Sequence, residues 1–344
     1  TMDLEELHKN ESIKDNSNFL RGTIAEGLLD ESTGALSKDD TQLTKFHGIY
    51  QQDDRDLRRE RRKAKEEPAY SFMIRVRVPG GVCSAKQWLE MDEIANTHAN
   101  STIKLTTRQA FQFHGIIKSN LKKSMQEINA SLLDTIAACG DVNRNVMCNP
   151  NPHQSSAHAE VLELSEKISD HLTPATSAYH DIWLTDMDTG ERKKVTPDVE
   201  PIYGKHYLPR KFKIVVAVPP SNDVDIYAHD LGFIAVLDED KNILGYNITV
   251  GGGMGMGHGK KETYPVLAQV LGFCTPDQAV DVAEKVVLVQ RDHGDRKKRE
   301  HARLKYTIDD HGLDWFRDQV EERLGYKLEA PRDFAFESNG DRYG

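Results

Sequence analysis

The sequence predicts an α+β protein that joins a small unit of strands and helices to a larger domain of the same class. Strand-like runs that alternate apolar and polar residues stand between helical runs with apolar residues three to four apart, first over 70–138 and again over 155–325. The 344 residues are enough for two or three domains. A content of 38% hydrophobic and 29% charged residues is that of a globular, water-soluble chain.

The small unit is expected to begin with a strand over 71–81, whose apolar residues point one way while Arg75 and Arg77 point the other. A further strand is expected over 110–117. If the chain is extended over 106–115, the alternation places Arg108, Gln112 and His114 on a face opposite the phenylalanines. The remaining elements of this unit are a helix, a strand and a helix over 85–99, 101–105 and 119–136.

The larger domain is expected to start with a helix over 156–172. Its strands are predicted at 182–184, 211–218, 233–237 and 244–250, and its closing helices near 264–273, 276–291, 297–309 and 313–324. Residues 1–68 are predicted to form a polar arm that ends in a charge-dense, solvated helix, because acidic residues interleave with the basic ones at helical spacing.

The overall charge excludes several classes of protein. The formal net charge is −10, whereas general nucleic-acid binders are basic, so no nucleic-acid partner is expected. No apolar run approaches the roughly 20 residues that span a bilayer, and the polar, acidic start is not a secretory signal. These features predict a cytoplasmic protein without a membrane partner.

The four cysteines show no metal-binding pattern. Cys83, Cys139, Cys148 and Cys274 form no Cys-x-x-Cys pair, and their gaps do not fit a zinc ribbon or a zinc finger. They are predicted to be buried or incidental thiols in a reducing compartment, so no residue is assigned as a metal ligand.

Four groups of cations stand beside apolar strands or tight loops. They are Arg108 with Gln112 and His114, Arg144 between Asn143 and Asn145, Lys211 with Lys213, and Arg75 with Arg77. Cations on apolar strand faces are costly unless something negative meets them. Each group alone also fits a lysine at a strand end or an arginine paired with a nearby aspartate. Together they favour a pocket for a polyanion.

The glycine-rich stretch over 247–264 follows a predicted strand, as a phosphate loop does. It lacks the third glycine of the dinucleotide fingerprint in every register, and it lacks the GKS or GKT ending of a Walker loop. Gly251 to Gly253 allow close approach of the backbone to a flat ligand, and a flexible turn is the other interpretation. In the charged stretch over 289–307, Arg291 and Lys305 stand out because each lies beside an apolar stripe.

Motifs along nearly the whole chain resemble, in the same order, the haemoprotein (beta) subunits of assimilatory NADPH-sulfite reductases, within the nitrite/sulfite reductase family. They are NFLRGTI, FHGIYQQDDRDLR, RVPGGV, TTRQAFQFHGI, DVNRNVMC, YLPRKFK, VGGG, QRDHG and LKYT. The QQDDRD segment favours this branch over the ferredoxin-nitrite reductases. The resemblance implies an arm (1–68), a ferredoxin-like half-domain (69–140), a first sirohaem domain (141–328) and a linker to a further half (329–344).

The resemblance also implies what the cations do. In that family the polyanion is sirohaem, an iron tetrahydroporphyrin carrying eight carboxylates, and the substrate sulfite is a second anion on its iron. Four cations of this sequence match those that surround the sulfite in the family: Arg108, Arg144, Lys211 and Lys213. The resemblance implies that they would supply protons for the six-electron reduction of sulfite to sulfide. The residues on stretches that line sirohaem in the family are Arg77, Gln112, His114, Asn145, Gly251, Gly252, Gly253, Arg291 and Lys305.

The sequence departs from the family in one respect. The motifs that bind the family's 4Fe-4S cluster, Cys-x5-Cys followed by Cys-x3-Cys, are absent, so this chain alone is expected to be inactive. The resemblance implies that the whole subunit serves cysteine biosynthesis and works with a flavoprotein (alpha) subunit that draws electrons from NADPH. Without a pseudo-symmetric half, the unit over 70–138 is expected to pair with a second copy in a homodimer, and a monomer whose N-terminal arm folds over the gap is the alternative. Nitrite reduction and a non-redox anion-binding scaffold are the alternative functions.

Overall fold

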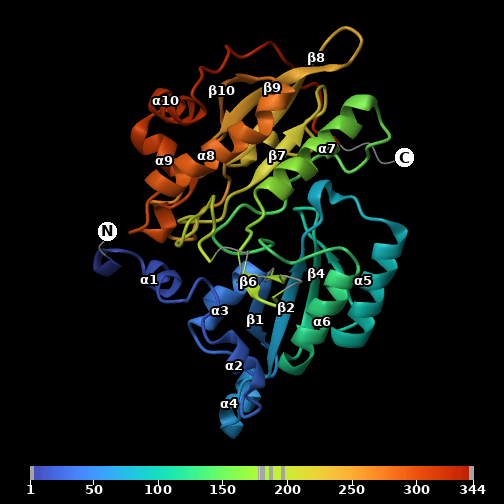
Figure 1. Cartoon of the computed structure of the whole chain (residues 1–344), viewed down its shortest axis with the longest axis vertical. Coiled ribbons are helices and arrows are strands. Elements are labelled where there is room, and N and C mark those ends of the chain that lie inside the picture. Colours follow the sequence, from blue (N-terminus) through green and yellow to red (C-terminus); the bar gives the residue numbers. More distant parts are fainter. Residues whose placement is uncertain (1–3, 177, 179–182, 186–188, 195–197, 341–344) are drawn as a thin grey trace.

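The chain folds into two α+β lobes, each built on a four-stranded sheet (Figure 1). The fold class predicted from the sequence is therefore confirmed. The computed structural model describes residues 4–176, 178, 183–185, 189–194 and 198–340.

The small lobe is an antiparallel sheet with strand order β1-β2-β4-β3 and two helices on one face (Figure 1). Its elements are β1 (Ile49–Asp53), β2 (Tyr70–Val76), α5 (Ala85–His98), β3 (Lys104–Leu105), β4 (Phe111–Ile116) and α6 (Lys118–Ala130). Ile74 and Phe113 face each other across β2 and β4 and are fully buried in the core that the sheet shares with the helices. The alternate positions, Arg75 and Gln112, also pair, and they give the opposite face its polar character.

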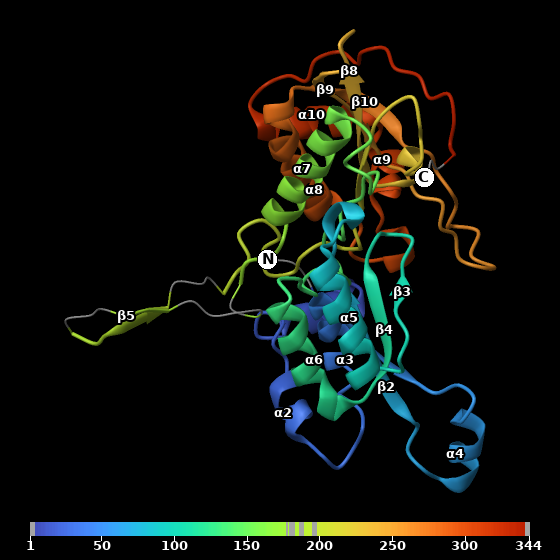
Figure 2. The same ribbon diagram turned by 90° about the vertical axis from the view of Figure 1, so that its right-hand side faces the viewer.

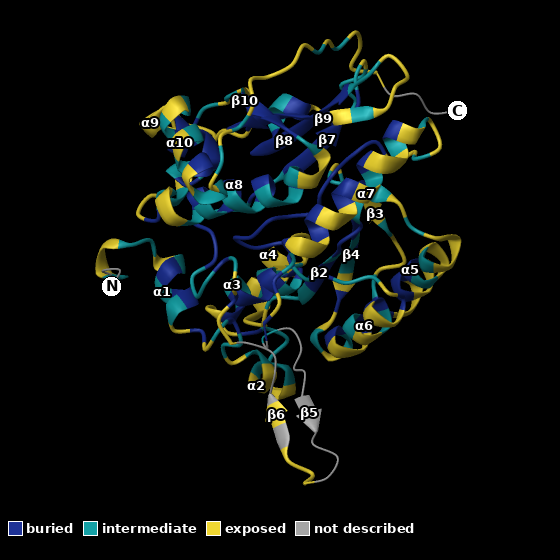
Figure 3. Cartoon of the chain, turned by 45° about the horizontal axis from the view of Figure 1, so that its top comes forward, coloured by how far each residue is buried: buried dark blue, intermediate teal, exposed yellow. Residues whose placement is uncertain are grey.

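The large lobe contains a mixed sheet with strand order β10-β9-β8-β7, in which only β7 and β8 run parallel. Its elements are α7 (Ser156–His171), β7 (Ile214–Ala217), β8 (Leu231–Leu237), β9 (Ile243–Val250), β10 (Gln269–Cys274), α8 (Ala279–His293), α9 (Leu304–His311) and α10 (Leu313–Leu324). The strands carry nearly continuous apolar runs because both sheet faces are covered (Figure 3). One face packs on α7 and α8, and Met147, Phe334 and Phe336 cover the other.

The first 68 residues are divided between the two lobes. Strand β1 adds an edge to the small sheet by pairing with β2, so this range includes part of the folded body as well as connecting segments. Helix α4 (Arg58–Ala64), the charge-dense segment, has no buried residue and extends away from the small lobe (Figure 2). The other helices of this range are α1 (Lys9–Asp15), α2 (Ile24–Leu29) and α3 (Asp40–Leu43).

The structure corrects the helix predicted over 264–273. The second half of this segment is strand β10, in which Gln269 pairs with Val250 of β9. The partner strand decides the conformation here, and local periodicity contains no information about it. Helix α6 also ends at Ala130 instead of 136, and Leu132 beyond it has a left-handed backbone (φ 63°) and is 89% exposed. Helix α9 begins only at Leu304, later than the predicted 297.

Two further elements lie outside the sheets of the two lobes. Strands β5 (Trp183–Thr185) and β6 (Arg192–Lys194) form a hairpin that projects from the body (Figure 2). Residue 182 of the strand predicted at 182–184 lies outside the described residues. Among the helices that the structure describes, none is long and apolar enough to cross a membrane.

Candidate functional site

Two adjoining cavities lie beside the start of β7: the larger is lined by residues of both lobes, and the smaller by residues of the large lobe and His8. The larger has a volume of about 590 Å³ and the smaller about 460 Å³, and they share Lys211, Gly255 and Arg303 in their walls. We call the two cavities together the cation cleft. Its walls come from β2, the turn before β4, the loop over 138–147, the start of β7 and the glycine-rich turn after β9.

Positive charge dominates the cation cleft. The cations that line the larger cavity are Arg75, Arg108, Arg144, Lys211, Lys213 and Arg303, and the carboxylates that line it are Asp223 and Asp225. The smaller cavity adds the cations Arg210, Lys260, Arg299 and Lys305, with Glu300 as its carboxylate. All four residues that the sequence predicted around a substrate anion thus lie in one cavity wall. An excess of guanidinium and ammonium groups is what binding of a multiply charged anion requires.

Arg108 is held in the turn before β4, so it lies outside the strand row that the alternation suggested. Its guanidinium donates to Asn145 O (2.9 Å) and to Nδ1 of His229 (2.6 Å). Because His229 Nε2 lies 3.0 Å from Val224 O, which can only accept, Nε2 carries the proton and Nδ1 receives the arginine bond. Burial lowers the pKa of Arg108 to about 9, which leaves the group charged at neutral pH.

Arg144 and Asn145 come from the loop that crosses between the lobes. The Arg144 guanidinium donates from Nε to Gly140 O (2.9 Å). The backbone N–H of Arg144 donates to Phe212 O (2.9 Å). The Asn145 amide donates to Val78 O and to Arg108 O, each at 2.8 Å. Asn145 is therefore a fixed link between the loop, β2 and the turn of Arg108, and its amide is buried in this role.

The two lysines of the cleft have pKa values close to neutrality. Burial, together with Lys213 and the neighbouring arginines, lowers the pKa of Lys211 to about 7. Burial and the charge of Arg108 lower the pKa of Lys213 to about 8. Asp230, which is fully buried, partly offsets the positive charge: it accepts from Arg303 (2.9 Å) and from the Lys213 backbone N–H (2.9 Å). Ammonium groups with such pKa values can both attract an anion and release a proton at neutral pH.

We expect the stabilisation of the chain by sulfate to be larger at pH 6.5 than at pH 9. Lys211 and Lys213 are largely protonated below pH 7 and lose their charge as the pH rises through about 7 and 8. Without an anion, the two lysines bind fewer protons in the folded chain than in the unfolded chain at any pH between their lowered pKa values and the ordinary lysine pKa of 10.5. Their contribution to the free energy of unfolding therefore increases with pH over this range, opposite to the effect of sulfate. Thermal unfolding with and without sulfate measures the difference, and an equal shift in Tm at both pH values would contradict it.

The glycine-rich turn after β9 contributes Gly253 and Gly255 to the wall, whereas Gly251 and Gly252 pack against Ile308 and the Tyr227 backbone. A Cβ on Gly252 would stand 2.2 Å from Tyr227 O, so a side chain cannot be accommodated there. Gly251 has a left-handed backbone (φ 84°), and Gly253 lines the larger cavity. Lys305 reaches this turn and donates to Gly253 O (3.0 Å) and Gly255 O (2.9 Å), so it holds the turn in place as well as lining the smaller cavity.

Six of the predicted residues are outside the walls of the cation cleft: Arg77, Gln112, His114, Gly251, Gly252 and Arg291. Arg77 pairs with Asp134 (2.7 Å), and Arg291 pairs with Asp292 (2.7 Å). Each of these arginines is paired with a carboxylate of the protein, and the sequence pattern around the arginine did not indicate that pairing. Gln112 and His114 bond to each other (2.7 Å), and Gln112 accepts from Arg75 (2.8 Å), so this predicted row supports a cation of the cleft without lining it.

Several residues of the cleft were missed in the sequence-based set. Arg75 was noticed in its strand but not assigned to the site, although it lines the larger cavity. Arg303 directly precedes the LKYT motif and Arg210 is the first residue of RKFK, and these positions were the available signal. His229 and Asp230 carry no motif signal, and their roles come from the approach of β8 to the start of β7.

The cysteines are not arranged as a ligand set. All four are free, and in the described part of the chain no group of three His, Cys, Asp or Glu side chains converges on one point. Burial raises the pKa of Cys148 to about 11 and that of Cys274 to about 12, so both thiols stay protonated.

We expect Cys83→Ala and Cys148→Ala, each made in a full-length relative, to leave the content of bound tetrapyrrole per folded protein unchanged. Cys148 is buried against Gly80, away from the walls of the cation cleft, and Cys83 also lies outside them. Absorption spectra normalised to protein concentration measure the content. A marked loss of cofactor in either variant would contradict the expectation, and loss of soluble protein would be scored separately as a packing effect.

The chain matches two family descriptions. Residues 63–131 match the nitrite/sulfite reductase ferredoxin-like half domain, and residues 163–328 match the nitrite and sulphite reductase 4Fe-4S domain. Curated relatives named sulfite reductase (NADPH) hemoprotein beta-component are 61% identical over 338 residues in Oceanobacillus iheyensis and 63% identical over 340 residues in Methylobacterium nodulans. These matches cover 98% of this chain but 58% and 56% of the relatives, so the chain spans less than two thirds of their length.

Two solved structures are also similar to this chain. The Mycobacterium tuberculosis NirA protein superposes with a TM-score of 0.72 at 27% identity, over 95% of this chain and 55% of NirA. Dissimilatory sulfite reductase I shares the fold at 12% identity, with a TM-score of 0.56 over 84% of this chain and 77% of its own. With both domain descriptions matched in sequence order and curated relatives similar along its whole length, the chain belongs to the nitrite and sulfite reductase family.

Proposed function

We propose that this chain supplies the anion-binding cleft in which a sulfite reductase holds sirohaem and sulfite, for the six-electron reduction of sulfite to sulfide. The observation that carries the proposal is the cation cleft, where arginines and lysines from both lobes outnumber the carboxylates. The curated relatives are named for sulfite, which favours sulfite over nitrite as the substrate. Because the chain spans 58% of the first of these relatives, the activity is proposed for a protein that includes this chain.

The residues of the cleft fit an anionic, flat macrocycle. Guanidinium groups bind carboxylates through paired hydrogen bonds, and Arg210 lines the smaller cavity. Arg299 and Arg303, which pair with Asp141 and Asp230, line the same cavity and add positive charge to it. Gly253 lines the larger cavity without a side chain, so a flat ligand can approach the backbone there. When bound, sirohaem supplies an iron centre that delivers electrons to the substrate.

The chain's own cations have two tasks towards sulfite. Arg108 and Arg144, whose guanidinium groups are fixed by hydrogen bonds to backbone carbonyls, orient and hold the oxyanion. Lys211 and Lys213 donate protons to departing oxygen, since their pKa values of about 7 and about 8 allow loss and recovery of a proton near neutral pH. The described cysteines do not fit a 4Fe-4S cluster, and we derive no step through one.

The absorption spectrum of the chain, purified from cells that make sirohaem, tests the proposal. We expect visible bands of the tetrapyrrole and a change of these bands on addition of sulfite. The matched control is the same chain with Lys211→Glu and Lys213→Glu, which reverses two charges and should lose the bands. A wild-type chain that folds but shows no bands at saturating sirohaem would reject the proposal and favour a scaffold without redox function.

We also propose that electrons come from a flavoprotein alpha subunit, because the relatives are named as beta components.

The homodimer through the small lobe stays a prediction. Light scattering behind a sizing column measures both assemblies, and a monomer of 38.9 kDa at all concentrations would reject the homodimer.

A further inference from the structure

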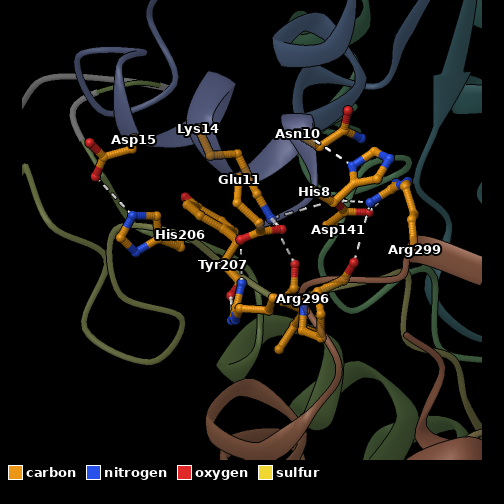
Figure 4. Close-up of polar contacts among 12 residues, drawn as sticks. His8, Asn10, Glu11, Lys14, Asp15, Asp141, His206, Tyr207, Arg296 and Arg299 are labelled. Atoms are coloured by element: carbon orange, nitrogen blue, oxygen red, sulfur yellow. Dashed lines mark hydrogen bonds and ion pairs between the residues drawn. The ribbon is translucent and has the colours of Figure 1, made fainter. Parts of the chain in front are cut away.

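A cluster of charged residues connects helix α1 to the backbone that leads into the cation cleft (Figure 4). Its members are Glu11, Lys14, Asp141, Arg296 and Arg299. The side chains of Glu11 and Lys14 are each 2% exposed, although they belong to the polar N-terminal range. The sequence predicted a polar arm over 1–68 and no role for Glu11 or Lys14.

Two carboxylates hold three cations in this cluster. Glu11 accepts from Lys14 (2.6 Å) through Oε1 and from Arg296 (2.7 Å) through Oε2. Asp141 accepts both Nη groups of Arg299, at 2.7 and 2.8 Å, and lies 3.6 Å from Lys14 Nζ. Burial favours the neutral form of Lys14 and lowers its pKa, and the two carboxylates oppose this effect.

The three cations bind three consecutive backbone carbonyls. Arg296 donates to Tyr207 O (2.6 Å). Lys14 donates to Leu208 O (3.0 Å). Arg299 donates to Pro209 O (3.2 Å). This stretch belongs to no helix or strand, so the side chains satisfy carbonyls that secondary structure would otherwise satisfy.

The stretch that is held in this way leads directly into the lysines of the cleft. Lys211 and Lys213 follow Pro209 by two and four residues. The Leu208 N–H donates to Asp141 O (3.0 Å), and the Phe212 N–H donates to Val142 O (3.1 Å). The cluster therefore fixes the lysine segment and the start of the Arg144 loop against each other.

Stability alone does not account for such a cluster. Removing charges from water costs several kcal/mol per ion, and buried ion clusters can often be replaced by apolar residues without loss of stability. A cluster that binds three successive carbonyls instead defines one backbone conformation. A fixed backbone conformation in turn fixes the positions of the side chains that follow it in the sequence.

We propose that Glu11 and Lys14 of α1 are positioning residues of the cation cleft that set where the ammonium groups of Lys211 and Lys213 stand. Lys14 holds the Leu208 carbonyl directly, and Glu11 holds the Tyr207 carbonyl through Arg296. The relevance of this placement to catalysis rests on the proposed function. The placement itself is a property of this chain that can be measured without cofactor or turnover.

Glu11→Gln in this chain tests the proposal through two measurements. Amide hydrogen exchange over 208–213 should accelerate about tenfold relative to β8 and β9, because the carbonyl anchors loosen. The pH midpoint for acylation of Lys211 should rise by on the order of one unit, as the ammonium group moves away from the Lys213, Arg303, Arg144 and Arg210 charges that lower its pKa. Mere loss of the Glu11 charge would move this midpoint down, so the sign separates the two causes.

Asp15→Asn is the matched control. Asp15 lies on the same helix and loses the same charge, but it contacts Lys205 (2.7 Å) and His206 (2.8 Å) near the surface (Figure 4). It should change neither measurement. If Glu11→Gln does not fold, Arg296→Lys serves in its place, because it keeps the charge but cannot span Glu11 and Tyr207 O together.

Unchanged exchange over 208–213, a lowered midpoint, or an equal response to Asp15→Asn would overturn the positioning role. These outcomes are distinct from failure of the proposed function. A chain that shows the exchange response but never binds sirohaem rejects the function alone, whereas a chain that binds sirohaem but shows no response rejects the positioning role alone.

Discussion

Replacing Lys213 or Arg144 by alanine in a full-length protein that contains this chain should lower sulfite turnover by about 10²–10³-fold, with a much smaller effect on folding. Both side chains line the larger cavity, and Arg144 is held by a backbone carbonyl before any substrate arrives. A fixed cation acts on charge that develops in the transition state, and its loss costs on the order of 3 kcal/mol. Steady-state kinetics with sulfite, together with thermal unfolding of each variant, measure the two effects.

Lys167→Ala is the control for this loss of charge. Lys167 is 65% exposed on α7 and pairs with Glu163, four residues earlier on the same helix. Its removal should leave turnover within twofold of the parent, on the order of what an exposed pair contributes. Near-normal turnover in both Lys213→Ala and Arg144→Ala would show that the substrate binds elsewhere.

Asp230→Asn should lower the free energy of unfolding of this chain by about 3–5 kcal/mol, the cost of breaking a buried ion pair. The carboxylate of Asp230 is fully buried and accepts from Arg303 at 2.9 and 3.0 Å. Asparagine keeps the shape but removes the negative charge, so Arg303 is left beside Lys211 and Lys213 without compensation. Urea denaturation of the isolated chain measures this change.

The matched control is Glu163→Gln, which removes a carboxylate that is 67% exposed and pairs with Lys167 at 3.3 Å. Exposed pairs of this kind contribute at most about 1 kcal/mol. A change below about 1 kcal/mol in Asp230→Asn would mean that solvent or a neighbouring group already screens the cations of the cleft. Sulfate should partly restore the stability of Asp230→Asn, since an anion in the cleft replaces the lost charge.

The regular parts of both lobes could be predicted because their information is local. Alternation in β2 and β4 placed the apolar residues on one face, and the buried pair Ile74 and Phe113 confirms this reading. The error at β10 has the opposite origin. Its apolar spacing fits a helix, but β9 offers an unpaired edge, and hydrogen bonds to that edge decide the conformation.

The candidate site was predictable to the extent that its residues stand in short motifs. Arg108, Arg144, Lys211 and Lys213 each lie beside an apolar strand or a tight loop, and they do meet in one cavity. Arg77 fits the same description but pairs with Asp134, which is 57 residues away along the chain. A local pattern identifies a cation that needs a partner, and it cannot tell whether the partner is a ligand or a carboxylate of the protein.

The sequence by itself determined the α+β class, most of the helices and strands, and the presence of more cations on apolar segments than local carboxylates could neutralise. Only the tertiary structure decided which of these cations face a common cavity, and it added Arg303, Asp230 and the α1 cluster that holds the lysine segment. The physical reason lies in the range of the interactions. Periodic burial acts between residues a few positions apart, whereas the Arg296–Glu11 pair joins residues 285 positions apart, and its existence depends on how the whole chain packs.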